Sequence, residues 1–461
     1  MENTSNKLLK MTQTSIPKLI ISLAVPNIVS MLITSIYNMA DTFFVGQIST
    51  SASGAVGVSF SLMAIIQAIG FTLSMGAGNY IARLLGQKNA KRASHVASTS
   101  FFTALGLGTV FTIAGLIFLD PLVLLLGATP TIFPHARAYT QYILIGAPFM
   151  TASYVLNGLL RFQGSAFYSM FGIGLGGLLN IALDPLFIFR FGMGTGGAAL
   201  ATIISQFISF CLLLYASGRG GNIKITFKEF KAEWSIYKEI LTGGLPSFYR
   251  QGLASVATIC LNLVAKPFGD AAIAAMSIVS RVLMFAVSAL IGFGQGFQPV
   301  CGFNFGAKLY NRVAQAFWFC LKTAAVALVL IATAGFIFAP RIISLFRKED
   351  LEVIAIGARA LRLQCITFPL HSWIIISNMM FQTIGESKKS SVIALARQGL
   401  FFLPLILVLP PLLGILGIQL SQPIADIFTF LVAIPMTSSV LSELNKLGKE
   451  ESQLCSKITP V

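Results

Sequence analysis

Long runs of apolar residues, separated by short polar segments, follow one another along the whole chain. A helix needs about 20 apolar residues to cross a bilayer, and on that basis the 461 residues predict about twelve spans. Their predicted ranges are 18–45, 53–80, 94–118, 137–159, 168–190, 195–217, 236–265, 271–300, 313–338, 355–382, 391–413 and 417–441. The pattern predicts an all-α polytopic membrane protein.

The composition agrees with this fold class. The chain is 55% hydrophobic and only 10% charged, with a mean hydropathy of +0.81. Soluble proteins carry about 25% charged residues, so a water-soluble enzyme is excluded. The six cysteines include no CxxC pair and lie mostly in apolar segments, so they indicate neither a metal site nor a disulfide framework.

The net charge of +16 is carried by loops that all fall on one side of the predicted membrane. Such a bias marks the cytoplasmic side, and it argues against a nucleic-acid-binding surface. We therefore expect both termini in the cytoplasm. Only the segment after the ninth span departs from this rule, since it carries basic residues on the opposite side. Their charge is balanced by the acids Glu349, Asp350 and Glu352. The residues that follow the rule are Lys7, Lys10, Lys18, Arg83, Lys88, Lys91, Arg92, Arg161, Arg219, Lys224, Lys228, Lys231, Lys238, Lys308, Arg312, Lys388, Lys389, Lys446 and Lys449.

The two halves of the chain resemble each other. Identical residues recur first at an offset of 220 and later at an offset of 221, at predicted kinks and loops: Pro26/Pro246, Ala55/Ala275, Gly76/Gly296, Gly86/Gly306, Lys88/Lys308, Arg92/Arg312, Pro148/Pro369, Asn157/Asn378, Gly164/Gly385 and Gly196/Gly417. Six spans per half make the repeats parallel, which favours alternating access by rocking of one half against the other. We expect a V-shaped pair of six-helix lobes around a central cavity, with the N-lobe at 1–217, a cytoplasmic linker at 218–235, the C-lobe at 236–445 and a cytoplasmic tail at 446–461.

Two acids stand at membrane depth in the first half. Of the 16 acidic residues, only Asp41, Asp184 and Asp426 lie well inside apolar segments. A charge there costs about 2.5–3.5 kcal/mol on insertion scales and marks ion, proton or ligand sites. Asn180 is one helical turn before Asp184 and shares its face.

Two carboxylates in one low-dielectric site cannot both ionise easily, so one of them is expected to hold a proton. The same oxygens, from Asp41, Asp184 and Asn180, could instead coordinate Na⁺. The alternative is that the acids only hydrogen-bond helices together.

Proline supplies candidate bending points at Pro26 and Pro246, and Pro185 loosens the helix beside Asp184, although proline is also ordinary in membrane helices.

Several segments together resemble the multidrug and toxic compound extrusion (MATE) transporters: VPNIVSMLITSIYNMADTFFVGQ, GNYIARLLGQKN, LNIALDPLFIFRFGMGTGGAALAT and QGFQPVCGFNFGAKLYNR. The resemblance extends over nearly the whole chain and is strongest to the MepA-like and DinF-like branches. It implies that Asp41 and Asp184 are the coupling carboxylates. It also implies hydrogen-bonding neighbours, and that proton or Na⁺ binding bends the first span and releases substrate outward. The implied neighbours are Asn180, Asn157, Tyr139 and Thr202.

The repeat offsets place Leu261 and Leu405 opposite Asp41 and Asp184, so the acidic pair belongs to one lobe only. A cation site in the second lobe, as in another branch of the family, is not expected.

The second lobe instead carries Arg250, Arg281, Arg397 and Asp426 in its spans. Buried arginine is seldom unpaired, so we expect Asp426 to pair with Arg281 or Arg397 as a structural clamp. A direct substrate contact is the alternative. His371 is interpreted as a satisfied polar residue.

The sequence therefore predicts a cell-membrane antiporter that exports amphipathic, often cationic, compounds in exchange for H⁺ or Na⁺. We expect a monomer that uses no cofactor. A flippase for lipid-linked precursors, from the same superfamily, is the related alternative. An intramembrane aspartyl protease would need a GxGD context that neither acid has, and a channel fits the two-lobe repeat less well.

Overall fold

The computed structural model describes residues 2–346 and 350–458, and its elements within these ranges are all helical. Glu349, one of the acids matched to the basic segment after the ninth predicted span, lies outside the described residues. The N-lobe consists of α2 (Ile16–Gly46), α3 (Thr50–Gly86), α4 (Ala90–Ile117), α5 (Leu119–Leu125), α6 (Phe133–Phe162), α7 (Ala166–Pro185), a π-helical turn (Leu186–Arg190) and α8 (Gly194–Ser217).

The C-lobe follows a linker that contains a short 3₁₀ turn (Phe227–Glu229). Its elements are α9 (Trp234–Ala265), a 3₁₀ turn (Lys266–Phe268), α10 (Asp270–Gly306), α11 (Tyr310–Ile337), α12 (Ala339–Ser344), α13 (Leu351–Thr367), α14 (Leu370–Ile384), α15 (Ser387–Leu395), a π-helical segment (Ala396–Phe402), α16 (Leu403–Leu413) and α17 (Ile415–Ile458). An additional helix, α1 (Glu2–Gln13), precedes both lobes.

Ten helices among the described residues are long and apolar enough to cross a membrane. The pair α13 and α14 makes an eleventh candidate, bent by 56° at the break before Leu370. The helix α9 has 32 residues but carries Lys238, Glu239 and Arg250, and it is not among these candidates. The sequence pattern counts α9 as the seventh span.

The internal repeat is visible in matching turns. Lys88 and Lys308, 220 residues apart, both adopt positive φ angles, of 61° and 64°. In each turn the next amide donates back to the end of the preceding helix, Asn89 to the Leu84 carbonyl at 2.9 Å and Leu309 to the Asn304 carbonyl at 2.8 Å. A non-glycine residue rarely adopts this conformation, so two equivalent cases support the offset predicted from the sequence.

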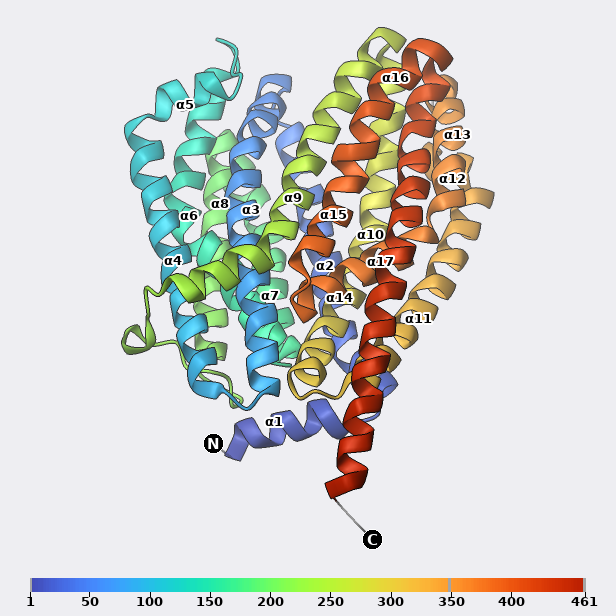
Figure 1. Cartoon of the computed structure of the whole chain (residues 1–461). Helices are drawn as coiled ribbons and strands as arrows, with labels where there is room; N and C mark the ends of the chain where they lie inside the picture. The colour runs from blue at the N-terminus through green and yellow to red at the C-terminus, as the bar shows by residue number, and fades with distance from the viewer. Residues whose placement is uncertain (1, 347–349, 459–461) are drawn as a thin grey trace.

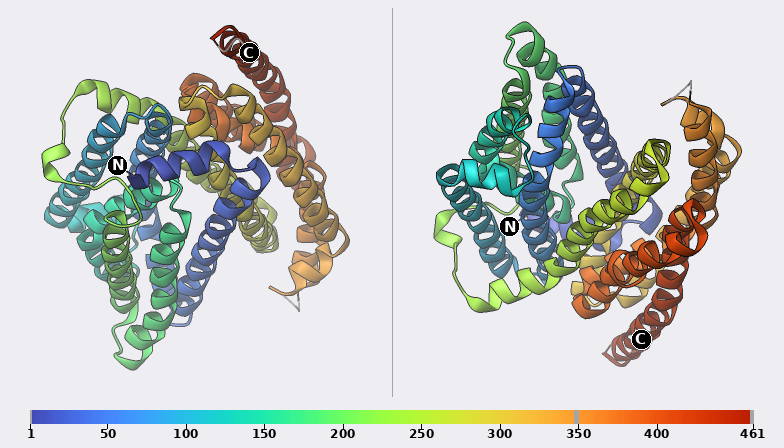
Figure 2. Two further views of the ribbon diagram at one scale, coloured as in Figure 1. Left: turned by 90° about the horizontal axis from the view of Figure 1, so that it is seen from below. Right: turned by 90° about the horizontal axis from the view of Figure 1, so that it is seen from above.

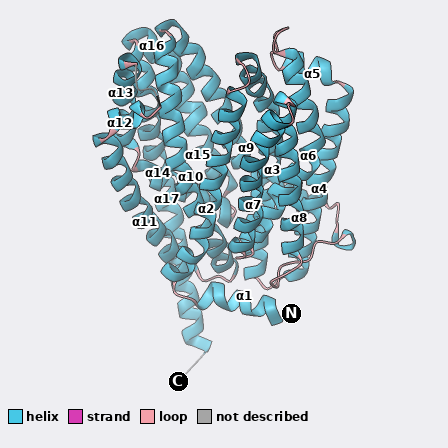
Figure 3. Cartoon of the chain, turned by 180° about the vertical axis from the view of Figure 1, so that it is seen from behind, coloured by secondary structure: helices cyan, strands magenta, loops and turns pink. Residues whose placement is uncertain are grey.

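The apolar core explains the V shape. One large cluster of buried residues contains Ile20 and Phe162 of the N-lobe together with Ile240 and Phe317 of the C-lobe. Two further clusters belong to single lobes, one around Tyr139 and the other around Phe368. The lobes thus share a core at one end and have separate cores towards the other, where they diverge in Figure 3.

The helix α1 lies across the shared end, near both termini (Figure 1; Figure 2, left). The Lys7 ammonium donates to Ser165 Oγ beside the N-lobe at 2.9 Å. On the C-lobe side, Asn304 Nδ2 donates to the Met11 carbonyl at 3.1 Å, and Arg312 donates to the carbonyl of Thr14 at 2.7 Å. These contacts show that α1 connects the two lobes. We call this end of the bundle the α1 end.

Candidate functional site

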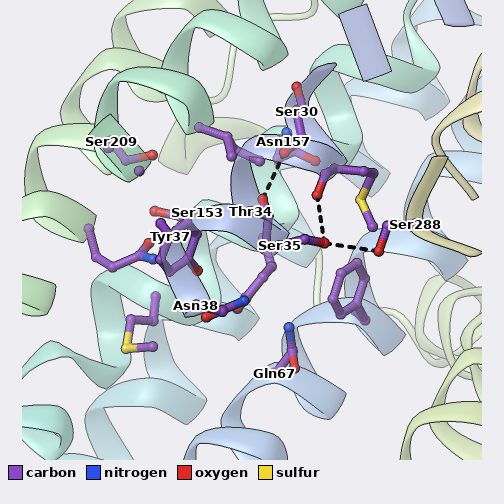
Figure 4. Close-up of a pocket in the computed structure, with 18 of the residues that line it drawn as sticks. Ser30, Thr34, Ser35, Tyr37, Asn38, Gln67, Ser153, Asn157, Ser209 and Ser288 are labelled. Carbon is purple, nitrogen blue, oxygen red and sulfur yellow. Dashed lines mark hydrogen bonds between the residues drawn. The ribbon is translucent and has the colours of Figure 1, made fainter. Parts of the chain in front are cut away.

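A cavity of about 280 Å³ lies between the lobes and is lined by α2, α3, α6, α7, α8, α9 and α10. Its wall is rich in hydroxyl and amide side chains, many of them visible in Figure 4. Ser35 on α2 and Ser288 on α10 connect the lobes through a hydroxyl hydrogen bond of 3.0 Å. Only three charged residues line the cavity among those that the structure describes: Asp41, Arg161 and Arg250.

Asp41 lies on the cavity wall near the far end of α2, five residues before the helix ends at Gly46. Its carboxylate oxygen Oδ1 is buried and has no hydrogen-bond partner. Asn38, one turn earlier on α2, also lines the cavity. A buried carboxylate oxygen without a donor has free capacity to take a proton or a cation.

Asp184 is fully buried at the end of α7, behind the cavity wall. Asn180 Nδ2 donates to Asp184 Oδ1 at 3.2 Å and also approaches Thr202 Oγ1 on α8 at 3.3 Å. The second carboxylate oxygen of Asp184 and the side-chain oxygen of Asn180 have no partner. The structure therefore brings Asn180, Asp184 and Thr202 together, as the resemblance implied.

Glycines on α7 let the neighbouring helices approach this site. A Cβ added to Gly177 would lie 2.9 Å from Ile33 on α2, and one added to Gly176 would lie 2.9 Å from Ser209 on α8. Such small residues allow close helix packing in membranes. The close approach holds α2, which carries Asp41, against the helix that carries Asp184.

Tyr139 and Asn157, both on α6, lie in different surroundings. Tyr139 is fully buried and interacts electrostatically with both Asp41 and Asp184. Asn157 lines the cavity but donates to Ser169 at the start of α7. Ser169 is 15 residues before Asp184 on the same helix, or about 22 Å at the usual helical rise. The structure thus places Tyr139 at the acids and Asn157 towards the α1 end.

The three predicted hinge prolines have different local structures. Pro26 and Pro246 lie inside α2 and α9, which continue through them as helices. Pro185 is the last residue of α7, and the π-helical turn Leu186–Arg190 follows it directly. Short π segments in membrane and soluble helices are frequent at functional sites, and this one adjoins Asp184.

The second lobe contains a buried charged cluster. Arg397 Nε donates to Asp426 Oδ1 at 2.8 Å, and Gln422 donates to the same oxygen at 2.9 Å. His371 Nε2 lies 2.9 Å from Asp426 Oδ2. Of the two arginines expected to pair with Asp426, the structure shows Arg397 as its partner, whereas Arg281 is exposed on α10. His371 belongs to the cluster through Nε2, while its Nδ1 has no partner.

The sequence pattern misplaced one of the charged residues of the cavity. It placed Arg161 in the loop after the fourth span as one more cytoplasmic charge, but α6 extends to Phe162 and Arg161 is only 2% exposed. Asn157 and Arg161 are one helical turn apart in the sequence, and this spacing could have indicated that they share a helix face. No group of three or more histidine, cysteine or acidic side chains in the described part of the chain could hold a metal ion.

Comparison with known proteins supports this architecture. The MatE family model matches the chain twice, at residues 26–186 and 246–408. The multidrug export protein MepA of Staphylococcus haemolyticus is 26% identical over 434 residues, 94% of this chain and 95% of that protein. A solved multidrug resistance MATE transporter in an outward-facing conformation superposes with a TM-score of 0.90 at 28% identity, covering 95% of this chain and 98% of that one.

Another similar structure is a MOP superfamily transporter from Pyrococcus furiosus, whose reversed binding-pocket polarity suggests a different function for that protein. It has a TM-score of 0.88 at 27% identity and covers 95% of this chain and 98% of that one.

The two-lobe helical fold with a polar cavity between the lobes defines a membrane transporter and not an enzyme. The chain belongs to the MATE family, since the two matches of the family model together cover most of its length. It is a multi-pass protein of the cell membrane.

Proposed function

We propose that this protein is a multidrug antiporter that exports amphipathic, often cationic, small molecules in exchange for H⁺ or Na⁺. The main support is a group of three buried oxygens without hydrogen-bond partners: Asp41 Oδ1, Asn180 Oδ1 and Asp184 Oδ2. Buried polar atoms are nearly always partnered. A bound proton or Na⁺ would satisfy these oxygens and offset the cost of placing two acids in a membrane.

The exchange follows from competition at this site. A cationic substrate in the cavity is favoured while Asp41 is ionised, because Asp41 is the only acid on the cavity wall among the described residues. A proton or Na⁺ at the acids neutralises the site and removes that attraction. Pro26 on α2 and the π turn after Pro185 are the positions at which the helices could adjust between the two states.

Alternating access would require the shared core at the α1 end to open while the far ends close. The placement of basic residues favours a cytoplasmic α1 end with both termini inside, and the similar MepA of Staphylococcus haemolyticus is a multidrug export protein. We expect a monomer to carry out the cycle, because the cavity is formed by one chain.

The test is efflux of a fluorescent cationic dye from proteoliposomes under a pH gradient or a Na⁺ gradient, imposed one at a time. We expect one gradient to drive efflux in the native protein and Asp41→Asn to reduce it to the level of protein-free liposomes. Asp120→Asn is the matched control, because Asp120 is an exposed acid of the same lobe, paired with Arg137. Unchanged efflux by Asp41→Asn would refute the assigned role.

A further inference from the structure

The cavity has a second charged region, formed by two arginines from opposite lobes. Arg161 comes from the last turn of α6 and Arg250 from α9, and both line the cavity. Their positive charges interact with each other. This arrangement needs an explanation, because like charges in a low-dielectric environment repel.

Neither arginine has an acidic partner among the residues that the structure describes. The ion pairs found within the described residues include neither Arg161 nor Arg250. Arg250 interacts with Arg397, whose charge is already matched by Asp426. The acids Asp41 and Asp184 are not a substitute, because they lie towards the far ends of α2 and α7.

The contacts of Arg161 are too weak to neutralise a buried guanidinium. Its Nη2 lies 3.1 Å from Met75 Sδ, and its charge lies over the Phe162 ring at 5.0 Å. Its Nε is buried and has no hydrogen-bond partner in the described part of the chain. A guanidinium has five donors in a fork that fits carboxylate or phosphate oxygens. A buried charge without such a partner is costly, so Arg161 has free capacity for an anionic ligand.

The neighbours of the two arginines add hydrogen-bonding groups but no negative charge. Asn157 lies one turn before Arg161, and Ser247 lies one turn before Arg250; both line the cavity. Gln251, next to Arg250, donates to Gln67 across the lobes at 3.0 Å. The wall around the two guanidinium groups is thus polar, and the apolar remainder of the cavity adjoins it, with Phe71 and Met150 among its members.

We propose that Arg161 and Arg250 form an oxyanion subsite that binds the phosphate-type headgroup of an amphiphile in the central cavity. Arg161 lies towards the α1 end, because Asn157, one turn before it on α6, donates to Ser169 near the start of α7. The cavity therefore has an anion-binding pole and a cation-binding pole. Because one arginine comes from each lobe, a bound oxyanion joins the lobes at this level.

This inference deepens the proposed export function by adding a substrate class, and it can be tested without transport. The full-length protein in a neutral detergent is titrated with myristoyl lysophosphatidate and, separately, with monomyristoylglycerol, which has the same chain without the phosphate. Isothermal titration calorimetry gives both dissociation constants. We expect lysophosphatidate to bind at least about tenfold more tightly, as a charge-assisted bidentate contact provides.

The variants Arg250→Gln and Arg161→Gln should each remove that preference. Arg281→Gln is the matched control, because Arg281 is an exposed arginine outside the cavity wall, and it should keep the preference. Arg161 is buried, so its variant is first checked by size-exclusion chromatography; if it does not fold, Arg250→Gln decides the matter, since Arg250 is only partly buried.

Titration with inorganic phosphate alone distinguishes the two sources of the oxyanion. Phosphate binding that Arg250→Gln removes identifies a site for the free anion, whereas binding of lysophosphatidate only identifies a site for a headgroup. Equal affinity for the two lipids, or a preference unchanged in Arg250→Gln, would overturn the proposal. Dye efflux by Asp41→Asn does not enter this measurement, so the two proposals fail independently.

Discussion

Gly86 and Gly306, which are 220 residues apart in the chain, pack against each other across the boundary between the two lobes. A Cβ added to Gly86 would lie 3.0 Å from Gly306 Cα and 2.2 Å from the Phe303 carbonyl oxygen. The reciprocal Cβ on Gly306 would lie 2.1 Å from the carbonyl oxygen of Arg83. Equivalent residues of the repeat thus meet at the α1 end, and the absence of side chains there lets α3 and α10 close the cavity.

Gly86→Val should weaken this closure. The new side chain meets backbone, which cannot move aside as a flexible side chain does, so we expect a cost of about 1–3 kcal/mol. The measurement is the melting temperature in detergent, with tryptophan fluorescence as the signal that reports unfolding. Gly57→Val is the matched control, because Gly57 is on the same helix and has nothing within 4 Å of its added Cβ. Equal melting temperatures for the two variants would contradict the packing role.

Asn180→Leu should impair exchange without unfolding the N-lobe. The substitution removes the amide that donates to Asp184 and approaches Thr202. A hydrogen bond to a charged group contributes about 1.5–3 kcal/mol, so we expect dye efflux to fall at least about tenfold. Initial efflux rates from proteoliposomes measure the effect.

Asn38→Leu is the comparison variant for Asn180→Leu. Asn38 is exposed on α2, and the hydrogen bonds within the described residues join Asp184 to Asn180 and not to Asn38. If both variants lose efflux equally, the role of Asn180 as the neighbour that positions Asp184 is wrong.

The attachment of α1 should depend on pH through Lys7. Burial, with a smaller effect of Lys10, lowers the pKa of Lys7 from 10.5 to about 8. Between about pH 8 and pH 10.5 the unfolded chain holds a proton on this side chain that the folded chain lacks, so folded-state stability rises with pH in this window. A neutral amine still donates to Ser165 and Asn222, so the contacts remain.

The measurement is the melting temperature of the native protein minus that of Lys7→Met, from pH 7 to pH 10.5. We expect this difference to increase with pH above about 8. A flat difference for Lys7→Met would show that Lys7 is charged in the folded protein throughout this range.

Asp426→Ala tests whether the second-lobe cluster is a clamp. The substitution leaves the buried His371 and the partly buried Arg397 without their acceptor, and breaking a buried ion pair in this way costs about 3–5 kcal/mol. We expect a clear fall in melting temperature. Asp270→Ala, at an exposed acid of the same lobe, should leave it unchanged. A stable Asp426→Ala protein that loses dye binding would assign Asp426 to the substrate.

Most of the helical layout could be predicted from the sequence, because the cost of exposing polar backbone to lipid imposes long apolar segments. The equivalent prolines Pro148 and Pro369 show the limit of this approach. Pro148 lies inside the continuous helix α6, whereas the chain breaks and bends by 56° beside Pro369. A proline removes one backbone hydrogen bond in both places, and the neighbouring helices determine whether the helix bends there.

The candidate site, like the helical layout, could be predicted from the sequence only in part. The acids Asp41 and Asp184 were found by their cost at membrane depth, which is a local property of each residue. Arg161 was assigned to a loop, because an arginine near the end of a span is usually a cytoplasmic charge. Only the packing of α6 against its neighbours shows that it is buried.

The sequence by itself determined the membrane-spanning helices, the duplicated architecture and the restriction of the acidic pair to one lobe. These are properties of hydropathy and spacing, which act along the chain. The tertiary structure decided which partners the polar groups meet. It placed Asp426 beside Arg397 and His371 and left Arg281 exposed. It also placed Arg161 and Arg250, which come from opposite lobes, on the wall of the same cavity. Partners of this kind lie tens or hundreds of residues apart, so their pairing depends on how the helices pack and not on any local pattern.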